Sequence, residues 1–184
     1  MRTADADILI VPGLGGAGPG HWQTRWDAKL PTTRRVIQSD WDQPKLEAWR
    51  DRLIEEVKLA ERPVILVAHG LGAIVVAHAA PHLRDLAKVK GAFLVAPPSP
   101  EILAAFPAID PAFADLKAEP LPFPGLIIVS RDDPHAPYAD SERLASALGA
   151  ELVDAGLSGQ INSDSGHGPW PEGLMRFAGF LKNL

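Results

Sequence analysis

The apolar stretch Val64–Ala80 constrains the fold more than any other part of the sequence. The segment Pro63–Ala68, which overlaps its beginning, is apolar throughout and predicts a strand covered on both faces. The segment Leu71–Ala80 is almost wholly apolar and predicts a helix buried on all sides. Two histidines and two glycines interrupt the stretch, so it falls short of a membrane span. A strand and a helix that are both fully buried need further layers of structure on either side of them.

The rest of the chain alternates in the same way between strand-like and helix-like segments. Predicted strands are Ile8–Val11, Arg35–Gln38, Pro63–Ala68, Gly91–Val95, Gly125–Ser130 and Glu151–Asp154. Predicted helices are His21–Leu30, Lys45–Leu59, Leu71–Ala80, Ala139–Leu148 with Gly149 as its stop, and Gly173–Leu181 with Leu174, Phe177 and Leu181 facing inward. This alternation predicts a single α/β domain over residues 1–184. We expect a three-layer α/β/α sandwich around a mainly parallel sheet of about six strands.

Two features of this organisation bear on where function lies. Ligands of such folds bind at the carboxyl ends of the strands, so we look for the site there. The proline-rich segment Pro107–Pro124 has little periodicity, and we expect it to be the least ordered part, as a lid or a surface loop.

Composition excludes several classes of function. The chain carries 18 Lys and Arg against 23 Asp and Glu, a net charge of −5, so we expect no nucleic-acid partner. It contains no cysteine, which excludes disulfides, thiolate–zinc sites and a catalytic thiol, and agrees with a cytoplasmic location. The polar start Met1–Asp7 and the short apolar run that follows predict no signal peptide, and we expect no membrane association.

A first glycine motif, Gly13–Gly18, follows the first predicted strand. It matches the G-x-G-x-x-G pattern of dinucleotide sites, with Asp40 near the end of the second strand as the ribose-binding candidate. Pro19 and Gly20 come directly afterwards, so a helix cannot begin where a pyrophosphate would need it. Dinucleotide binding through this motif is therefore an alternative interpretation.

A second motif, Ala68-His69-Gly70-Leu71-Gly72, lies between the buried strand and the buried helix. Its small residues suit a nucleophile elbow, a strained turn that exposes one reactive side chain above a sheet. The central residue is Gly70, which has no side chain that could attack a substrate. The local sequence therefore leaves open whether this is an elbow or a plain glycine-rich turn.

Segments elsewhere in the chain resolve this ambiguity. They are His21-Trp22-Gln23 with Trp26, Ser130-Arg131-Asp132-Asp133-Pro134, Gly159-Gln160-Ile161-Asn162, Ser165-Gly166, and Trp170-Pro171-Glu172-Gly173. In this order, the chain from Ile8 to Leu181 resembles the small, lidless α/β-hydrolases of the retinoblastoma-binding-protein-9-like serine hydrolase family. The resemblance implies a lidless α/β-hydrolase fold.

The resemblance also implies a catalytic triad in the order Ser, Asp, His. Here Gly70 stands at the nucleophile position, Asp133 at the acid position, with Asp132 as the alternative, and Gln160 at the base position. A glutamine amide forms hydrogen bonds but cannot accept and return a proton at neutral pH. Losing a triad lowers turnover by about 10⁶-fold in a well-studied protease. The resemblance places the oxyanion donors, which are backbone N–H groups, at Leu14 and Leu71.

Other residues are candidates for the remaining roles. His167 is the best substitute base, and water activated by Asp133 is another route. His69 is expected to be a packed histidine beside the elbow, while Trp22 and Trp170 are expected near the pocket. Ser39 and Ser99 are weaker nucleophile candidates. His78 and His82 form the only i, i+4 histidine pair and lack a neighbouring carboxylate signature, so we expect no metal and no cofactor.

These observations predict a hydrolase-family protein that is inactive or very weak as an esterase. We expect its pocket to bind a small carbonyl or carboxylate ligand, or a protein partner. Two alternatives stay open: an active hydrolase of small esters or amides that uses His167 or Asp133-activated water, and a dinucleotide-binding protein.

Overall fold

A computed structural model describes residues 1–184 and contains one six-stranded sheet. The strands are β1 (Asp7–Val11), β2 (Thr33–Arg35), β3 (Val64–His69), β4 (Val89–Val95), β5 (Gly125–Val129) and β6 (Glu151–Asp154). They lie in the order β2-β1-β3-β4-β5-β6, and every neighbouring pair is parallel. The predicted α/β class and parallel six-stranded sheet are confirmed.

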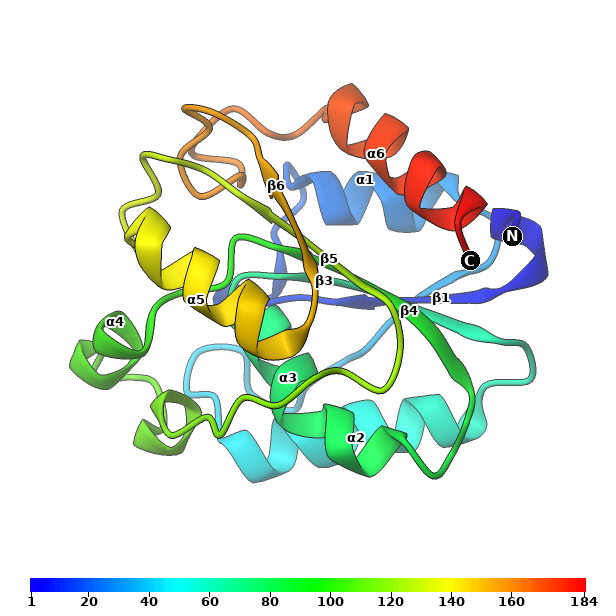
Figure 1. The fold of residues 1–184 in the computed structure, drawn as a ribbon, viewed down its shortest axis with the longest axis horizontal. Coiled ribbons are helices and arrows are strands. Elements are labelled where there is room, and N and C mark those ends of the chain that lie inside the picture. The colour runs from blue at the N-terminus through cyan, green and yellow to red at the C-terminus, as the bar shows by residue number, and fades with distance from the viewer.

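Helices cover both faces of the sheet (Figure 1). One face carries α1 (Trp22–Lys29) and α6 (Pro171–Lys182). The other face carries α2 (Leu46–Leu59), α3 (Leu71–Leu83) and α5 (Tyr138–Leu148). Short helices lie in the connections: α4 (Pro100–Ala105) and the 3-10 helices η1 (Thr3–Asp5), η2 (Leu14–Gly16) and η3 (Pro111–Ala114). The three-layer α/β/α arrangement is thus as predicted.

Strand β3 shows why the sequence folds in three layers. All six of its residues are buried, and successive side chains point to opposite faces. Leu66 joins a buried cluster of 31 residues on the α2–α3 side. Ile65 and Val67 join a second buried cluster of 17 residues on the α1–α6 side, which is rich in aromatic rings. Because the side chains of β3 enter a buried cluster on each face of the sheet, the strand has to be apolar at nearly every position.

Three predicted details differ from the structure. Strand β2 spans Thr33–Arg35 instead of Arg35–Gln38, because it is a short edge strand without a buried face. Leu174 is 39 % exposed and does not face inward. Helix α4 was not predicted, although Ser99 caps it and Pro100 occupies its first position. The other helices and strands end within a few residues of their predicted limits.

The segment Pro107–Pro124 is more ordered than its composition predicts. It contains η3, and Phe113 at the centre of η3 is completely buried against α2 and α3. Ile109 and Phe123 are also buried, so both ends of the segment are anchored. None of the helices is long and apolar enough to cross a lipid bilayer.

Candidate functional site

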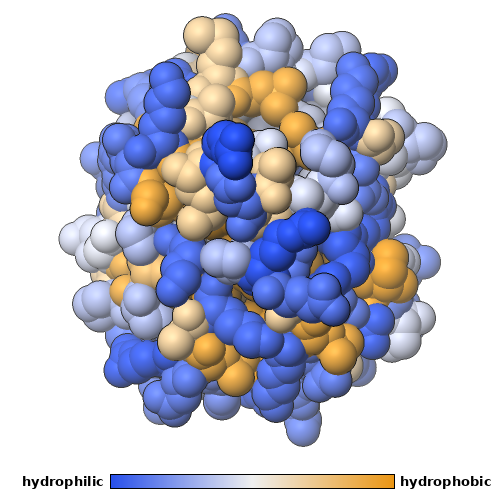
Figure 2. Space-filling view, turned by 90° about the vertical axis from the view of Figure 1, so that its right-hand side faces the viewer, coloured by the Kyte–Doolittle hydropathy of each residue, from blue (hydrophilic) through white to orange (hydrophobic).

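A cavity of about 340 Å³ opens where the first glycine motif meets the turn after β3. Its walls come from the loop around Gly13–Gly18, the turn His69–Leu71, helix α4 with its flanks, and the loop Gln160–Asp164, together with His21 and His135. The cavity therefore lies at the carboxyl ends of β1 and β3, where ligands of open parallel sheets bind. On the face at the other end of the strands, hydrophilic residues predominate and hydrophobic ones form small separate groups (Figure 2).

The turn between β3 and α3 has the geometry of a nucleophile elbow. Gly70 has φ 57° and ψ −127°, a conformation that side-chain-bearing residues rarely adopt. Two residues later, a Cβ atom on Gly72 would lie only 2.2 Å from the Val11 carbonyl oxygen, so only glycine fits there. The turn is thus shaped like an elbow although no nucleophile is present.

The structure brings Gln160 directly over this turn. Its Nε2 atom lies 3.8 Å from the position of a Cβ atom built on Gly70, and no other atom outside the adjoining residues comes within 4 Å of that position. Its Oε1 atom accepts a hydrogen bond from Asn162 Nδ2 at 3.0 Å. The two positions separated by 90 residues in sequence, 70 and 160, therefore meet in space as the resemblance implies.

The two candidate acids have different surroundings. Asp132 accepts hydrogen bonds from the Ser130 hydroxyl at 2.6 Å and from the Gly159 N–H at 2.8 Å, and these bonds lower its pKa. It thereby ties the end of β5 to the loop that carries Gln160. Asp133 is partly buried, and burial raises its pKa to about 6, against the opposing effect of the hydrogen bond from the His135 N–H at 2.8 Å. No hydrogen bond joins Asp133 to Gln160, and Asp133 is not on the cavity wall.

Both predicted oxyanion residues line the cavity. Leu71 is the first residue of α3, so its N–H has no partner within the helix. Leu14 begins η2 in the facing loop. The Gly13–Gly18 motif thus folds against the elbow, and α1 begins only at Trp22. The motif consequently lacks the adjoining helix N-terminus that a dinucleotide pyrophosphate requires.

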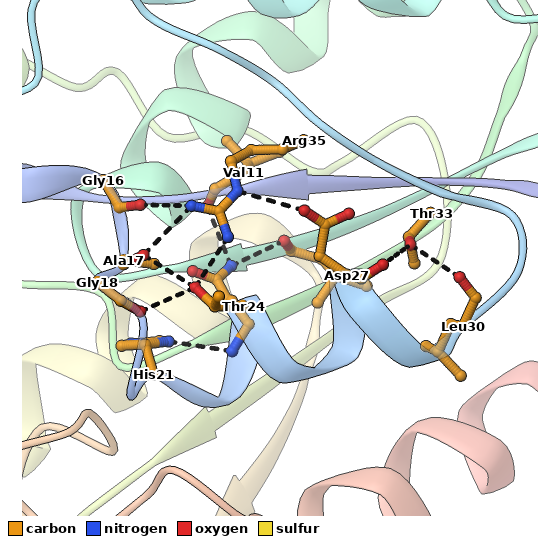
Figure 3. Close-up of polar contacts among 12 residues, drawn as sticks. Val11, Gly16, Ala17, Gly18, His21, Thr24, Asp27, Leu30, Thr33 and Arg35 are labelled. Carbon is orange, nitrogen blue, oxygen red and sulfur yellow. Dashed lines mark hydrogen bonds and ion pairs between the residues drawn. The ribbon is translucent and has the colours of Figure 1, made fainter.

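Arg35 holds the facing loop in place (Figure 3). Its Nη1 atom donates hydrogen bonds to the carbonyl oxygens of Gly16 at 2.8 Å and Ala17 at 3.2 Å. Its Nη2 atom donates to Thr24 Oγ1 at 2.8 Å, which connects the loop to α1. Sequence analysis did not identify this positioning role, because the arginine and the loop meet only after β1 and β2 pair.

Two neutral histidines stand side by side at the cavity. His21, which belongs to a motif noted in the sequence but was given no role there, caps α1 through Nδ1, which accepts a hydrogen bond from the Gln23 N–H at 3.1 Å. His69 donates through Nε2 to the Gln160 carbonyl oxygen at 2.8 Å. Their ring centroids are 4.6 Å apart. Burial lowers the pKa of His21 to about 3 and that of His69 to about 4. His69 is packed as predicted, with 6 % of its surface exposed, and it also lines the cavity.

Three other candidate residues do not reach the cavity wall. His167 lies outside the wall, with its Nδ1 atom 2.8 Å from Ser165 Oγ. Trp22 and Trp170 were expected near the pocket, but they pack with each other and with Trp26 in the core beneath it. Trp22 is completely buried, and its indole N–H donates to the Ile161 carbonyl oxygen at 2.9 Å. Both tryptophans therefore support the site loops from behind.

The weaker candidates also have other surroundings. Ser99 is buried as the N-cap of α4, and Ser39 lines a separate shallow depression. His78 contacts the Phe113 carbonyl oxygen at 3.1 Å, far along α3 from the elbow. No three His, Asp or Glu side chains are grouped so that they could hold a metal ion.

Comparison with known proteins supports the same fold and family. The model of the serine hydrolase family matches residues 8–179. A protein from Pectobacterium atrosepticum, named as a YdeN-like hydrolase, is 32% identical, with a TM-score of 0.84 over 97% of this chain and 91% of that one. The ydeN gene product of B. subtilis is similar in fold at 21% identity, with a TM-score of 0.77 over 96% of this chain and 99% of that one. No curated protein matches the sequence.

Proposed function

This chain belongs to the serine hydrolase family, and we propose that within it the chain is a ligand-binding member that has lost covalent catalysis. The observation that carries the proposal is Gly70 in the elbow conformation, because an elbow without a side chain offers no atom to acylate. By its motifs, we assign the chain to the retinoblastoma-binding-protein-9-like group of that family.

The base position supports the same conclusion. Gln160 occupies the place over the elbow from which a histidine would take the nucleophile's proton. Two histidines of the cavity wall, His21 and His69, do not replace it. The Nδ1 atom of His21 and the Nε2 atom of His69 are engaged in hydrogen bonds, and both rings have low pKa values, so they are weak bases. His167 points toward Ser165.

The binding half of the site is retained. The backbone N–H groups of Leu14 and Leu71 do not depend on side-chain identity, so an oxyanion-binding nest survives the two substitutions. An apolar wall lies beside it on α4. We propose that this cavity takes a small carbonyl or carboxylate ligand, with a protein partner as the alternative occupant, and that the protein acts in the cytoplasm.

A second candidate function is weak hydrolysis by water. The pKa of Asp133, raised to about 6, lies in the range that suits a general base. If Asp133 or His167 activates water, turnover of a short p-nitrophenyl ester falls in Asp133→Asn or His167→Ala. Activity that persists in both variants contradicts this route.

A fluorophosphonate probe tests the main proposal, because it reacts only with an activated nucleophile. We expect no covalent labelling of the wild-type protein, as read by intact mass. The variant Gly70→Ser with Gln160→His serves as the positive control, since it restores the missing groups at the same positions. Labelling of any serine in the wild-type protein would overturn the proposal.

A further inference from the structure

We propose that the ligand of this cavity is a small monocarboxylate with an apolar tail, whose carboxylate is held by His21 Nε2, Gln160 Nε2 and the Leu71 N–H. The inference rests on the proposed function, in which the site binds without hydrolysing. Three N–H groups from three separate segments, none with an acceptor of its own in the protein, carry the argument.

The orientation of the Gln160 amide follows from a chain of hydrogen bonds. The backbone N–H of Ser165 can only donate, and it meets Asn162 Oδ1 at 3.1 Å. The other end of the Asn162 amide is therefore Nδ2, which donates to Gln160 Oε1 at 3.0 Å. The remaining atom of Gln160 is Nε2, and it is this donor that lies 3.8 Å from the Cβ position over Gly70.

The tautomer of His21 follows in the same way. The backbone N–H of Gln23 donates to Nδ1, so Nδ1 carries no proton and Nε2 carries it. His21 is only 5 % exposed and lines the cavity, yet Nε2–H has no hydrogen-bond partner in the protein. Gln23 Oε1 is the one fully buried side-chain nitrogen or oxygen atom without a partner, so His21 Nε2 keeps contact with solvent and its N–H is free to donate to a ligand in the cavity.

The third donor is the N–H of Leu71 at the start of α3. This helix is 13 residues long, and its first turn presents N–H groups and a partial positive charge toward the cavity. His21 lines the same cavity and adds a side-chain donor from a separate segment. The N–H groups of the α3 N-terminus and of His21 therefore both favour a ligand atom that accepts hydrogen bonds.

The donor set favours a carboxylate over other oxygen groups. A carboxylate offers two oxygens and only accepts, whereas an alcohol or an amide also brings protons that need acceptors. The two acceptors of Gln160, which lies over the elbow, are already engaged: Oε1 by Asn162 and the carbonyl oxygen by His69. Asp164 is the one carboxylate on the wall, and it is solvent-exposed, where water and salt weaken its repulsion.

The apolar part of the cavity wall indicates what the rest of the ligand is like. Seven hydrophobic residues border the cavity: Leu14, Ala17, Leu71, Ile102, Leu103, Phe106 and Ile109. Leu14 is 40 % and Phe106 39 % exposed, so apolar surface is available at the opening. The cavity volume of about 340 Å³ lies at the small end of ligand pockets, which suits a short alkyl or aryl chain.

Calorimetry with octanoate and octanol on the wild-type protein near pH 7 tests the head group. Both probes carry the same tail, and we expect octanoate to bind at least tenfold more tightly. Equal affinities, or no binding of octanoate at millimolar concentration, would overturn the inference. Amide NMR supplies a second reading on the wild-type chain, in which octanoate shifts the Leu71 N–H resonance and octanol does not.

The variant Gln160→Glu tests the donor itself. It keeps the shape of the side chain and the acceptor for Asn162, but replaces the free donor with a negatively charged oxygen. We expect octanoate binding to weaken about a hundredfold while octanol binding is unchanged. Asn183→Asp, the same amide-to-acid change on an exposed residue of the C-terminus, is the matched control and should alter neither.

The experiments distinguish a failure of the proposed loss of catalysis from a failure of the proposed carboxylate site. Covalent labelling of the wild-type protein contradicts the loss of catalysis whatever octanoate does. Octanoate binding that Gln160→Glu leaves unchanged contradicts the carboxylate site, even when the protein remains unlabelled.

Discussion

Replacing Gly70 with alanine should destabilise the protein, because the turn holds this residue at φ 57° and ψ −127°. A residue with a side chain in such a region costs about 1–3 kcal/mol. The loss of glycine flexibility in the unfolded chain offsets about 0.4–1 kcal/mol of this. No steric clash adds to the cost, since the nearest atom to the new Cβ, Gln160 Nε2, is 3.8 Å away. The net loss is about 1–2 kcal/mol, which corresponds to a fall in Tm of roughly 2–8 °C for a chain of this size.

Urea unfolding followed by tryptophan fluorescence measures this change. Gly179→Ala is the matched control, because Gly179 lies inside α6 and has no atom within 4 Å of its Cβ position. Alanine there should raise the free energy of unfolding by about 0.5–1 kcal/mol. Gly70→Ser should resemble Gly70→Ala, apart from a gain of up to about 1 kcal/mol if its hydroxyl meets Gln160. If Gly70→Ala is as favourable as Gly179→Ala, the turn stores no strain and our description of the elbow is wrong.

Two further predictions concern catalysis and pH. Gly70→Ser with Gln160→His should hydrolyse p-nitrophenyl acetate, and adding Asp133→Asn should remove most of that activity; a folded but inactive double variant would contradict our placement of the site. The free energy of unfolding should fall as pH drops from 6.5 toward 4, because the unfolded chain protonates His21 and His69 while the folded chain, with pKa values of about 3 and 4, does not. Asp133, whose pKa is raised to about 6, changes the free energy of unfolding in the opposite direction between pH 6 and 4. Its effect should be the smaller one, because it is a single group and the two histidines act together. Urea unfolding across this range should show the loss, and a flat profile would refute it.

The parts of the fold that could be predicted are those with a strong apolar signal. Strand β3 and helix α3 are apolar at nearly every position, and both were located within three residues of their ends. Strand β2 has no such signal, since an exposed edge strand of Thr and Arg looks like a loop. Helix α4 had a readable start in Ser99-Pro100, but its proline-rich surroundings hid it.

The site likewise has a part that could be predicted from the sequence and a part that could not. The resemblance to the serine hydrolase family implied the roles of positions 70 and 160, and the structure brings Gly70 and Gln160 together. The directions of side chains could not be predicted. Trp22 and Trp170 lie next to site segments in sequence but face the core. The donor role of His21 depends on which ring nitrogen caps α1, which only the three-dimensional structure shows.

The elbow has a consequence for how this protein could evolve. The turn is held by the close approach at Gly72 and by the hydrogen bonds from Gly70 N–H to the Val95 carbonyl oxygen and from Ala73 N–H to the Gly70 carbonyl oxygen. None of these depends on the side chain at position 70, so the turn keeps its shape without a nucleophile. If, as we propose, this chain has lost hydrolysis, its backbone already has the turn that a nucleophile needs, and the missing groups are confined to positions 70 and 160.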